Sequence, residues 1–162
     1  MLALGKFTLK LNFLILKTYE WTTIQKYSNQ PEILELLIQK NCNINSLNKN
    51  GCSALHVAVN KQHINCIKIL IKYKCDVNNQ DSYGDTALHD IISKETSKET
   101  KQIIELLLSV PSINLSIRNK RGFNTLHHAS LKGNSTYNFF SSWRKFTLCK
   151  TNFFYHKEQS KN

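Results

Sequence analysis

Gly51-Cys52-Ser53-Ala54-Leu55-His56 is the first of three stretches with the same pattern, and this repetition decides the fold. The other two are Gly84-Asp85-Thr86-Ala87-Leu88-His89 and Gly122-Phe123-Asn124-Thr125-Leu126-His127. The second begins 33 residues after the first, and the third begins 38 residues after the second. Because self-similarity at such a period indicates stacked units, we predict a solenoid in which each unit packs on its neighbours.

A period near 33 with a T-x-L-H core resembles the ankyrin repeat, which is a β-turn followed by two helices. The predicted fold class is therefore all-α, an ankyrin-repeat solenoid of β-turn plus helix-loop-helix units, incomplete at both ends. The predicted units are a partial one at 30–47, a full one at 48–80, an expanded one at 81–118 and a partial one at 119–134.

Residues 1–29 and 135–162 do not follow the pattern, and we predict two non-repeat segments there. Both boundaries are abrupt, which we interpret as those of a partial or mis-spliced gene product. The basic and aromatic tail at 135–162 has a functional alternative, stacking on nucleic acid or lying at a membrane surface. Since truncated outer units lack polar caps, we expect marginal stability or aggregation.

The residue after each repeated turn is a good helix N-cap: Ser53, Thr86 and Asn124. The leucines two positions later are predicted to form one core ladder, and His56, His89 and His127 to bond between neighbouring turns. The alternative is a metal site that adds His63, His128, Cys52 or Cys66. Equivalent residues spread along a solenoid rather than around one point, so we expect no metal and no cofactor.

The second helix of each unit carries an apolar stripe at spacing i, i+1, i+4, i+5, as in Cys66, Ile67, Leu70 and Ile71. The same spacing recurs from Ile33 and from Ile103. Asn41 and Lys74 stand where the helices of ankyrin repeats usually end in Gly. Asn tolerates the left-handed conformation of such a position, and Lys tolerates it less well.

The third unit departs from the pattern in two places. Its extra residues fall mostly in the polar tandem from Ser93 to Thr100, which we predict to be a loop between the helices or an extension of one of them. Phosphorylation of Ser93, Thr96, Ser97 or Thr100 is the functional alternative. Ile91 replaces the Ala of the other units, which predicts strain of about 1–3 kcal/mol or a shifted helix.

Charge and cysteine content restrict the function class. The net charge is +11, but residues 30–134 carry thirteen basic and nine acidic residues, so +7 of it lies outside the units. No recognition motif accompanies this charge, and we expect no nucleic acid partner. Five cysteines without a C-x-x-C pair favour reduced thiols in the cytoplasm. The apolar run near Phe7 is too short and too polar to span a bilayer.

Two consecutive segments narrow the resemblance. Asp81 to Asp90, followed by Ile92-Ser93-Lys94, is similar to the D-x-x-G-D-T-x-L-H-D-A-I-S-K stretch of mind bomb-type RING E3 ubiquitin ligases. Asn119 to Ala129 resembles the continuation N-x-x-G-F-N-x-L-H-H-A in the same family, and Asn48 to His63 resembles the preceding unit. The resemblance covers about residues 30–134.

This resemblance implies a role in Notch signalling, where such ligases ubiquitinate Notch ligands and drive their endocytosis. The chain departs from the family because a RING needs eight Cys/His ligands, which five cysteines without paired spacing do not supply. We therefore predict a non-catalytic protein-interaction module, with two alternatives: a stand-alone ankyrin adaptor unrelated to Notch, or a ligase active in its own right.

The predicted contact surface consists of the turn tips and the first helices, because these line the concave face of such a solenoid. The exposed candidates are Lys49, Tyr83, Asp85, Lys120, Arg121 and Phe123. Tyr, Phe and Arg are the residue types favoured at interface hot spots, although turn residues are also often merely solvated.

Overall fold

The computed structural model describes residues 30–131 of the 162-residue chain. The predictions for residues 1–29 and 135–162, including the basic and aromatic tail, lie outside these residues. Within the described part the chain forms helices and no named strand, which confirms the all-α class. The helices are α4 (Pro31–Gln39), α5 (Ala54–Asn60), α6 (Ile64–Lys72), α7 (Ala87–Ser93), α8 (Lys98–Leu108) and α9 (Thr125–Leu131).

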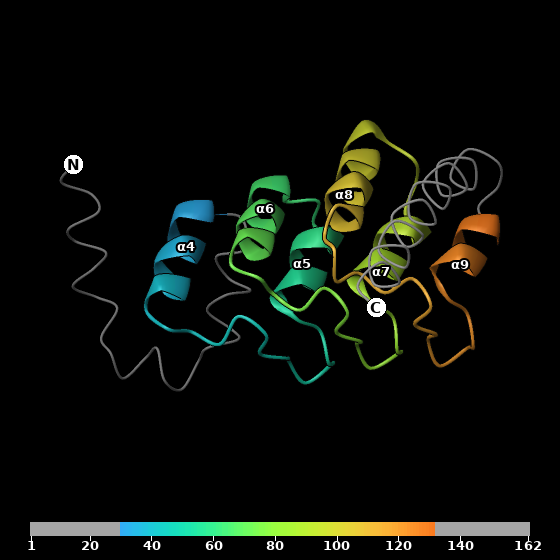
Figure 1. Cartoon of the computed structure of the whole chain (residues 1–162), viewed down its shortest axis with the longest axis horizontal. Helices are drawn as coiled ribbons and strands as arrows, with labels where there is room; N and C mark the ends of the chain where they lie inside the picture. Colours follow the sequence, from blue (N-terminus) through green and yellow to red (C-terminus); the bar gives the residue numbers. More distant parts are fainter. Residues whose placement is uncertain (1–29, 132–162) are drawn as a thin grey trace, which may run out of the picture.

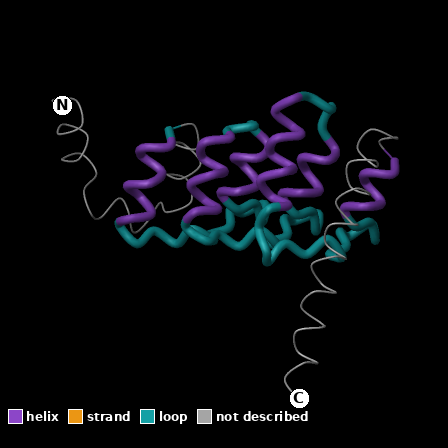
Figure 2. The backbone as a smooth tube through the Cα atoms, turned by 45° about the horizontal axis from the view of Figure 1, so that its top comes forward, coloured by secondary structure: helices purple, strands orange, loops and turns teal. Residues whose placement is uncertain are grey.

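The helices lie in two rows (Figure 1). Helices α5, α7 and α9 pack on one another in sequence, and α4, α6 and α8 form the second row. Helices α5 and α6 also pack together as a pair, and so do α7 and α8. The long loops between the pairs gather on one side of the helices (Figure 2). This is the stacked arrangement that the repeat period predicts.

One continuous core runs between the rows. Leu55 and Leu88 are both buried in it, and Leu126 is half-buried and packs against it. The stripe of α6 is buried at Cys66, Ile67 and Leu70. Burying each Leu or Ile side chain contributes about 1.5–3 kcal/mol, so the ladder supplies much of the drive for stacking. The predicted leucine ladder is confirmed.

The predicted N-caps begin the first helices. Ser53 Oγ accepts the backbone N–H of His56 at 3.5 Å, and the Ser53 N–H donates to His56 Nδ1 at 3.1 Å. Asn124 Oδ1 accepts the N–H of His127 at 3.1 Å. In each case the residue three positions after the cap is His, which closes a reciprocal capping box in place of the usual Glu or Gln.

Two of the second helices, α4 and α6, end in the left-handed conformation. Asn41 has φ 61° and Lys74 has φ 58°, and Gln62 after α5 has φ 57°, which the sequence did not suggest. At the end of α6, the N–H of Cys75 bonds Leu70 O at 3.0 Å, as in a Schellman motif. Lys74 accepts a backbone cost of about 1–2 kcal/mol that Gly would avoid.

The polar insertion is part loop and part helix: its first residues connect α7 to α8 and the rest extend α8, which agrees with the predicted alternative of an extended helix. Only Lys94 to Ser97 connect α7 to α8, and α8 already begins at Lys98. Ser97 Oγ accepts the N–H of Thr100 at 3.1 Å, and Thr100 is only 2% exposed, with its hydroxyl bonded to Glu95 O. Thr100 is therefore inaccessible as a phosphorylation site. Ile91 is fully buried within α7, and the strain expected there stays a prediction.

Candidate protein-interaction face

Each turn is held rigid by the side chain that opens it. Asn48 Oδ1 accepts the backbone N–H groups of Asn50 and Cys52, both at 2.8 Å. The side chain of Asp81 does the same for Tyr83 and Asp85, at 2.8 and 2.9 Å, and that of Asn119 for the third turn. Because the opening residue alone fixes the loop, the two residues at each tip are free to vary and to face outward.

The glycines that close the turns allow the turns to stack. Gly51, Gly84 and Gly122 have φ between 73° and 80°, where Gly is favoured. A Cβ on Gly84 would lie 2.8 Å from the backbone nitrogen of Lys120, so the next turn lies directly against it. The N–H of Lys120 donates to Tyr83 O at 3.0 Å, and the N–H of Ser82 donates to Asn50 O at 2.9 Å. The three turns therefore form one connected edge.

Buried histidines join each first helix to the next turn. His56 Nε2 lies 3.1 Å from Asp85 O, and His89 Nε2 lies 3.2 Å from Phe123 O. Since Nδ1 of each ring accepts the N–H of its cap residue, Nε2 carries the proton and donates to the carbonyl. Burial lowers the pKa of both histidines, which favours this neutral form. The predicted histidine bonds between turns are confirmed for His56 and His89.

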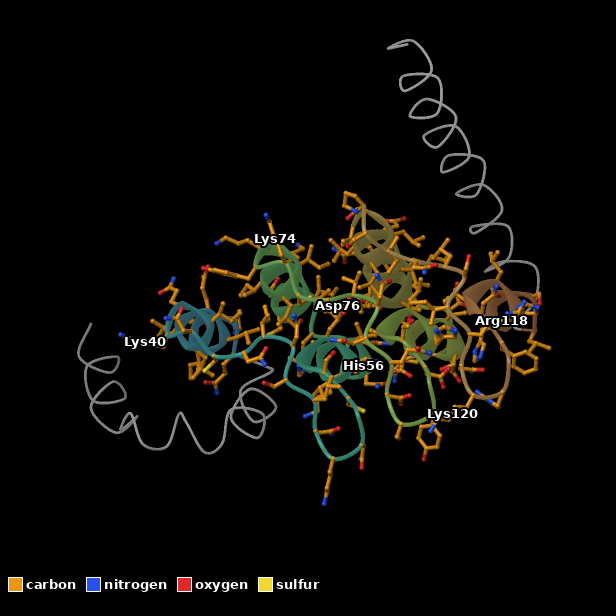
Figure 3. The ribbon with its side chains drawn as sticks, turned by 60° about the horizontal axis from the view of Figure 1, so that its bottom comes forward. Lys40, His56, Lys74, Asp76, Arg118 and Lys120 are labelled. Atoms are coloured by element: carbon orange, nitrogen blue, oxygen red, sulfur yellow. The ribbon has the colours of Figure 1, made fainter. Side chains whose placement is uncertain are left out.

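The candidate contact residues lie on this edge and differ in solvent exposure. Tyr83 is 72% exposed, and Lys49, Lys120 and Arg121 are exposed at the tips. Figure 3 shows Lys120 at the turn side of the molecule, which faces forward in that view. Phe123 is 37% exposed and stacks on the ring of His127, with 6.0 Å between centroids.

A sequence profile described as Ankyrin repeats (3 copies) matches residues 24–116, which is more than half of the chain. The chain belongs to the ankyrin-repeat family. A comparison with curated proteins found no match. The ankyrin family explains why the turns, the capping histidines and the paired helices recur together.

Asp85 has a structural role in this ankyrin array besides its place among the candidates. Asn119 uses its side-chain oxygen for backbone N–H groups, so its Nδ2 faces Asp85 Oδ1 at 2.7 Å and His128 Nε2 at 3.2 Å. Arg121 approaches the second oxygen of Asp85 at 4.0 Å. The half-buried carboxylate thus ties the third unit to the turn of the fourth unit, and its contact with a partner remains a prediction.

The carboxylate of Asp90, on the first helix of the third unit, has a role that the sequence did not reveal. This carboxylate is half-buried on α7 and accepts a hydrogen bond from Asn60 Nδ2 of the preceding ankyrin repeat at 2.9 Å. Burial, with the nearby charges of Asp81 and Asp85, raises the pKa of Asp90 to about 6. The register of the repeats places residues 60 and 90 on adjacent first helices, but nothing in the sequence marks them as partners.

Residues 30–131 give no support to a metal site, a reactive buried thiol or a membrane-spanning helix. No group of three or more His, Cys, Asp or Glu side chains there is placed to hold a metal ion. Burial raises the pKa of the Cys66 thiol and raises that of Cys75 to about 12, so these thiols are unreactive. Over the same residues, no helix combines the length and apolar character needed to cross a membrane.

Proposed function

We propose that the ankyrin array binds a protein partner along its turn edge and first helices. The observation that supports this most directly is the separation of roles within the turns. Asn48, Asp81 and Asn119 hold the backbone, while the side chains of Lys49, Tyr83 and Lys120 at the tips are exposed. A preorganised edge of this kind binds with little loss of conformational entropy.

Site-specific photo-crosslinking in the full chain tests this proposal. A benzoyl-phenylalanine in place of Tyr83 lies on the turn edge, and the same group in place of Lys68 lies on the exposed side of α6. We expect a protein crosslinked at position 83 and absent at position 68, identified by mass spectrometry. Equal crosslinking at both positions, or none at either, would contradict a partner on the turn edge.

The narrower proposal is that this module acts in the ubiquitination and endocytosis of Notch ligands, in the cytoplasm. Its support is the similarity of residues 81–94 and 119–129 to the ankyrin region of mind bomb-type ligases. The chain would then contribute binding and leave ubiquitin transfer to a RING protein. The reduced state of Cys52, Cys66 and Cys75 fits a cytoplasmic environment.

Two measurements separate this proposal from its alternatives. Pull-down with the cytoplasmic tails of Notch ligands and with ligase domains should recover the chain; recovery by neither would leave a stand-alone adaptor. A ubiquitination assay with a ubiquitin-conjugating enzyme should be negative for the chain alone. Activity without an added RING protein would instead make the chain a ligase in its own right.

A further inference from the structure

The turn edge carries positive charge that residues 30–131 do not neutralise. Lys49 and Lys120 are exposed at tips and make no ion pair within residues 30–131. Arg118 is exposed beside the third turn, where its guanidinium donates to the carbonyl of Gly122 at 2.9 Å. Figure 3 shows Arg118 and Lys120 on neighbouring parts of the turn side.

The carboxylates of the same edge are withdrawn from solvent. Asp81 is half-buried, and its Oδ1 accepts two backbone N–H groups of its own turn. Asp85 is half-buried as well and is held by Asn119 and Arg121. The outermost charges are therefore cationic, while the anionic groups face inward and already have donors. Such an edge attracts an acidic partner and steers its approach.

Tyr83 gives this cationic edge an aromatic centre. Its backbone carbonyl accepts the N–H of Lys120, so the Tyr83 and Lys120 tips are adjacent. The tyrosine side chain is 72% exposed, and its aromatic ring provides contact area that a charged tip lacks. A partner that covers Tyr83 and its neighbours needs carboxylates and an apolar or aromatic side chain in the same short segment.

A protein segment fits this edge better than a nucleic acid does. Asp81, Asp85 and Asp90 lie just inside the row of tips, on the turns and on α7. A phosphate backbone carries negative charge at every step and would meet these carboxylates as well as the lysines. A protein segment can set carboxylates against the tips and hydrogen-bond donors against the groups behind them.

We propose that the turn edge formed by Lys49, Tyr83, Lys120 and Arg121 docks an acidic segment of a partner protein that contains an aromatic residue. This inference rests on the proposed interaction function and names the chemistry of the partner. It concerns the outer edge of the turns, so it leaves open which contacts the first helices add.

Fluorescence anisotropy with the full chain provides the test. The probes are a short labelled peptide in which Asp and Glu alternate with Ser around a central Tyr, its counterpart with Asn and Gln in place of Asp and Glu, and a labelled oligo-dT strand of similar length. We expect the acidic peptide to bind about tenfold or more tightly than the other two, with an affinity that falls as salt is raised. Equal or tighter binding of the oligonucleotide would overturn the inference.

Matched charge reversals locate the site. Lys49→Glu with Lys120→Glu should weaken the acidic peptide about tenfold or more, and Tyr83→Ala should weaken it severalfold. Lys68→Glu with Lys101→Glu makes the same charge change at exposed positions of α6 and α8 and should alter binding less than about twofold. Equal losses in the two double variants would mean a nonspecific charge effect and would contradict the inference.

The controls keep failure of folding and failure of function apart. Circular dichroism should show the same helix content in every variant, and Lys49→Gln with Lys120→Gln repeats the test without added negative charge. Absence of acidic-peptide binding, combined with a specific crosslink at position 83, would overturn the acidic-segment inference and leave the interaction function intact. Absence of acidic-peptide binding together with absence of the crosslink would contradict both the acidic-segment inference and the proposed interaction function.

Discussion

At Asp90, burial of the side chain opposes ionisation of its carboxylate. Its carboxylate has one hydrogen bond, from Asn60, and lies near the charges of Asp81 and Asp85. An ionised carboxylate in such surroundings loses solvation that a single amide does not replace. Its pKa rises from 3.8 to about 6 for these reasons, so Asp90 penalises the folded state at neutral pH.

Asp90→Asn should therefore stabilise the protein at neutral pH. Because folding raises the pKa of Asp90, its protonated form stabilises the folded state fully at pH values below the unfolded pKa of 3.8. This stabilisation is lost as the pH rises through the folded pKa of about 6. We expect a gain of about 1–2 kcal/mol near pH 7.5 that disappears near pH 4, measured by urea unfolding. Asp76→Asn, at an exposed carboxylate, is the control and should change little. A gain for Asp90→Asn that persists near pH 4 would show that charge is not its cause.

At the scale of the element, the first helices depend on a capping pair rather than on a long apolar stripe. Helix α7 has seven residues, too few to be stable alone. Thr86 N–H donates to His89 Nδ1 at 3.2 Å, the hydroxyl of Thr86 lies 2.8 Å from the same nitrogen, and Nε2 reaches Phe123 O. One buried ring thus satisfies the start of its helix and the next turn.

His89→Ala should cost about 2–3 kcal/mol, because it leaves buried polar groups without partners. His127→Ala is the matched control, since His127 has the same place in its unit but is exposed; its cost should stay below about 1 kcal/mol. Thermal unfolding compares the two variants.

The pH dependence gives a second readout for His89. Its pKa is lowered by folding, so its contribution is lost as pH falls through the ordinary value of 6.5. The variant His89→Ala should accordingly lose less stability between about pH 7.5 and 5.5 than the native chain does. A pH profile unchanged by the substitution would contradict the neutral, bonded state of His89.

The start of α7 could be predicted from the sequence, whereas the sequence left the insertion before α8 open between a loop and an extension of a helix, for a physical reason. Thr86 precedes a run whose register repeats elsewhere, so local capping chemistry identifies it. Lys98 to Thr100 are polar and precede the apolar stripe that begins at Ile103. Ser97 caps the helix locally, but the insertion contains several Ser and Thr residues that could cap a helix. Thr100 is also buried, and its hydroxyl accepts a bond from Gln62 at 3.4 Å, a tertiary contact that has no local signature.

At the scale of the whole molecule, the sequence predicts which elements stack and the bonds of His56 and His89 to the next turn, but not the asparagine bonds that join the units. Asn45 Oδ1 accepts the N–H of Asp76 at 2.8 Å, and Asn78 Oδ1 accepts that of Asn114 at 2.8 Å. These bonds connect successive loops, and the bond from Asn60 to Asp90 connects the successive first helices α5 and α7. Their partners lie about one repeat apart, so they require the register of the stack and not a motif. The same register turns scattered tip residues into one continuous edge.

Substitution of two glycines separates the contribution of turn stacking to stability from that of backbone strain. Gly84→Ala and Gly122→Ala both place Ala at positive φ, 77° and 80°, and both should pay about 1 kcal/mol for it. Of these two, only Gly84 meets the next turn, where a Cβ would lie 2.8 Å from Lys120 N; at Gly122 no atom of the described part of the chain lies within 4 Å of one.

Gly84→Ala should therefore cost at least about 2 kcal/mol more than Gly122→Ala in urea unfolding followed by circular dichroism. It should also speed amide hydrogen exchange at Lys120, whose bond to Tyr83 O must lengthen. Gly51→Ala offers an independent repeat, because its Cβ would lie 2.9 Å from Ser82 N. Because stability in a solenoid sums over units and their interfaces, similar losses in all three variants would mean that the turns do not abut and that the binding edge is not continuous.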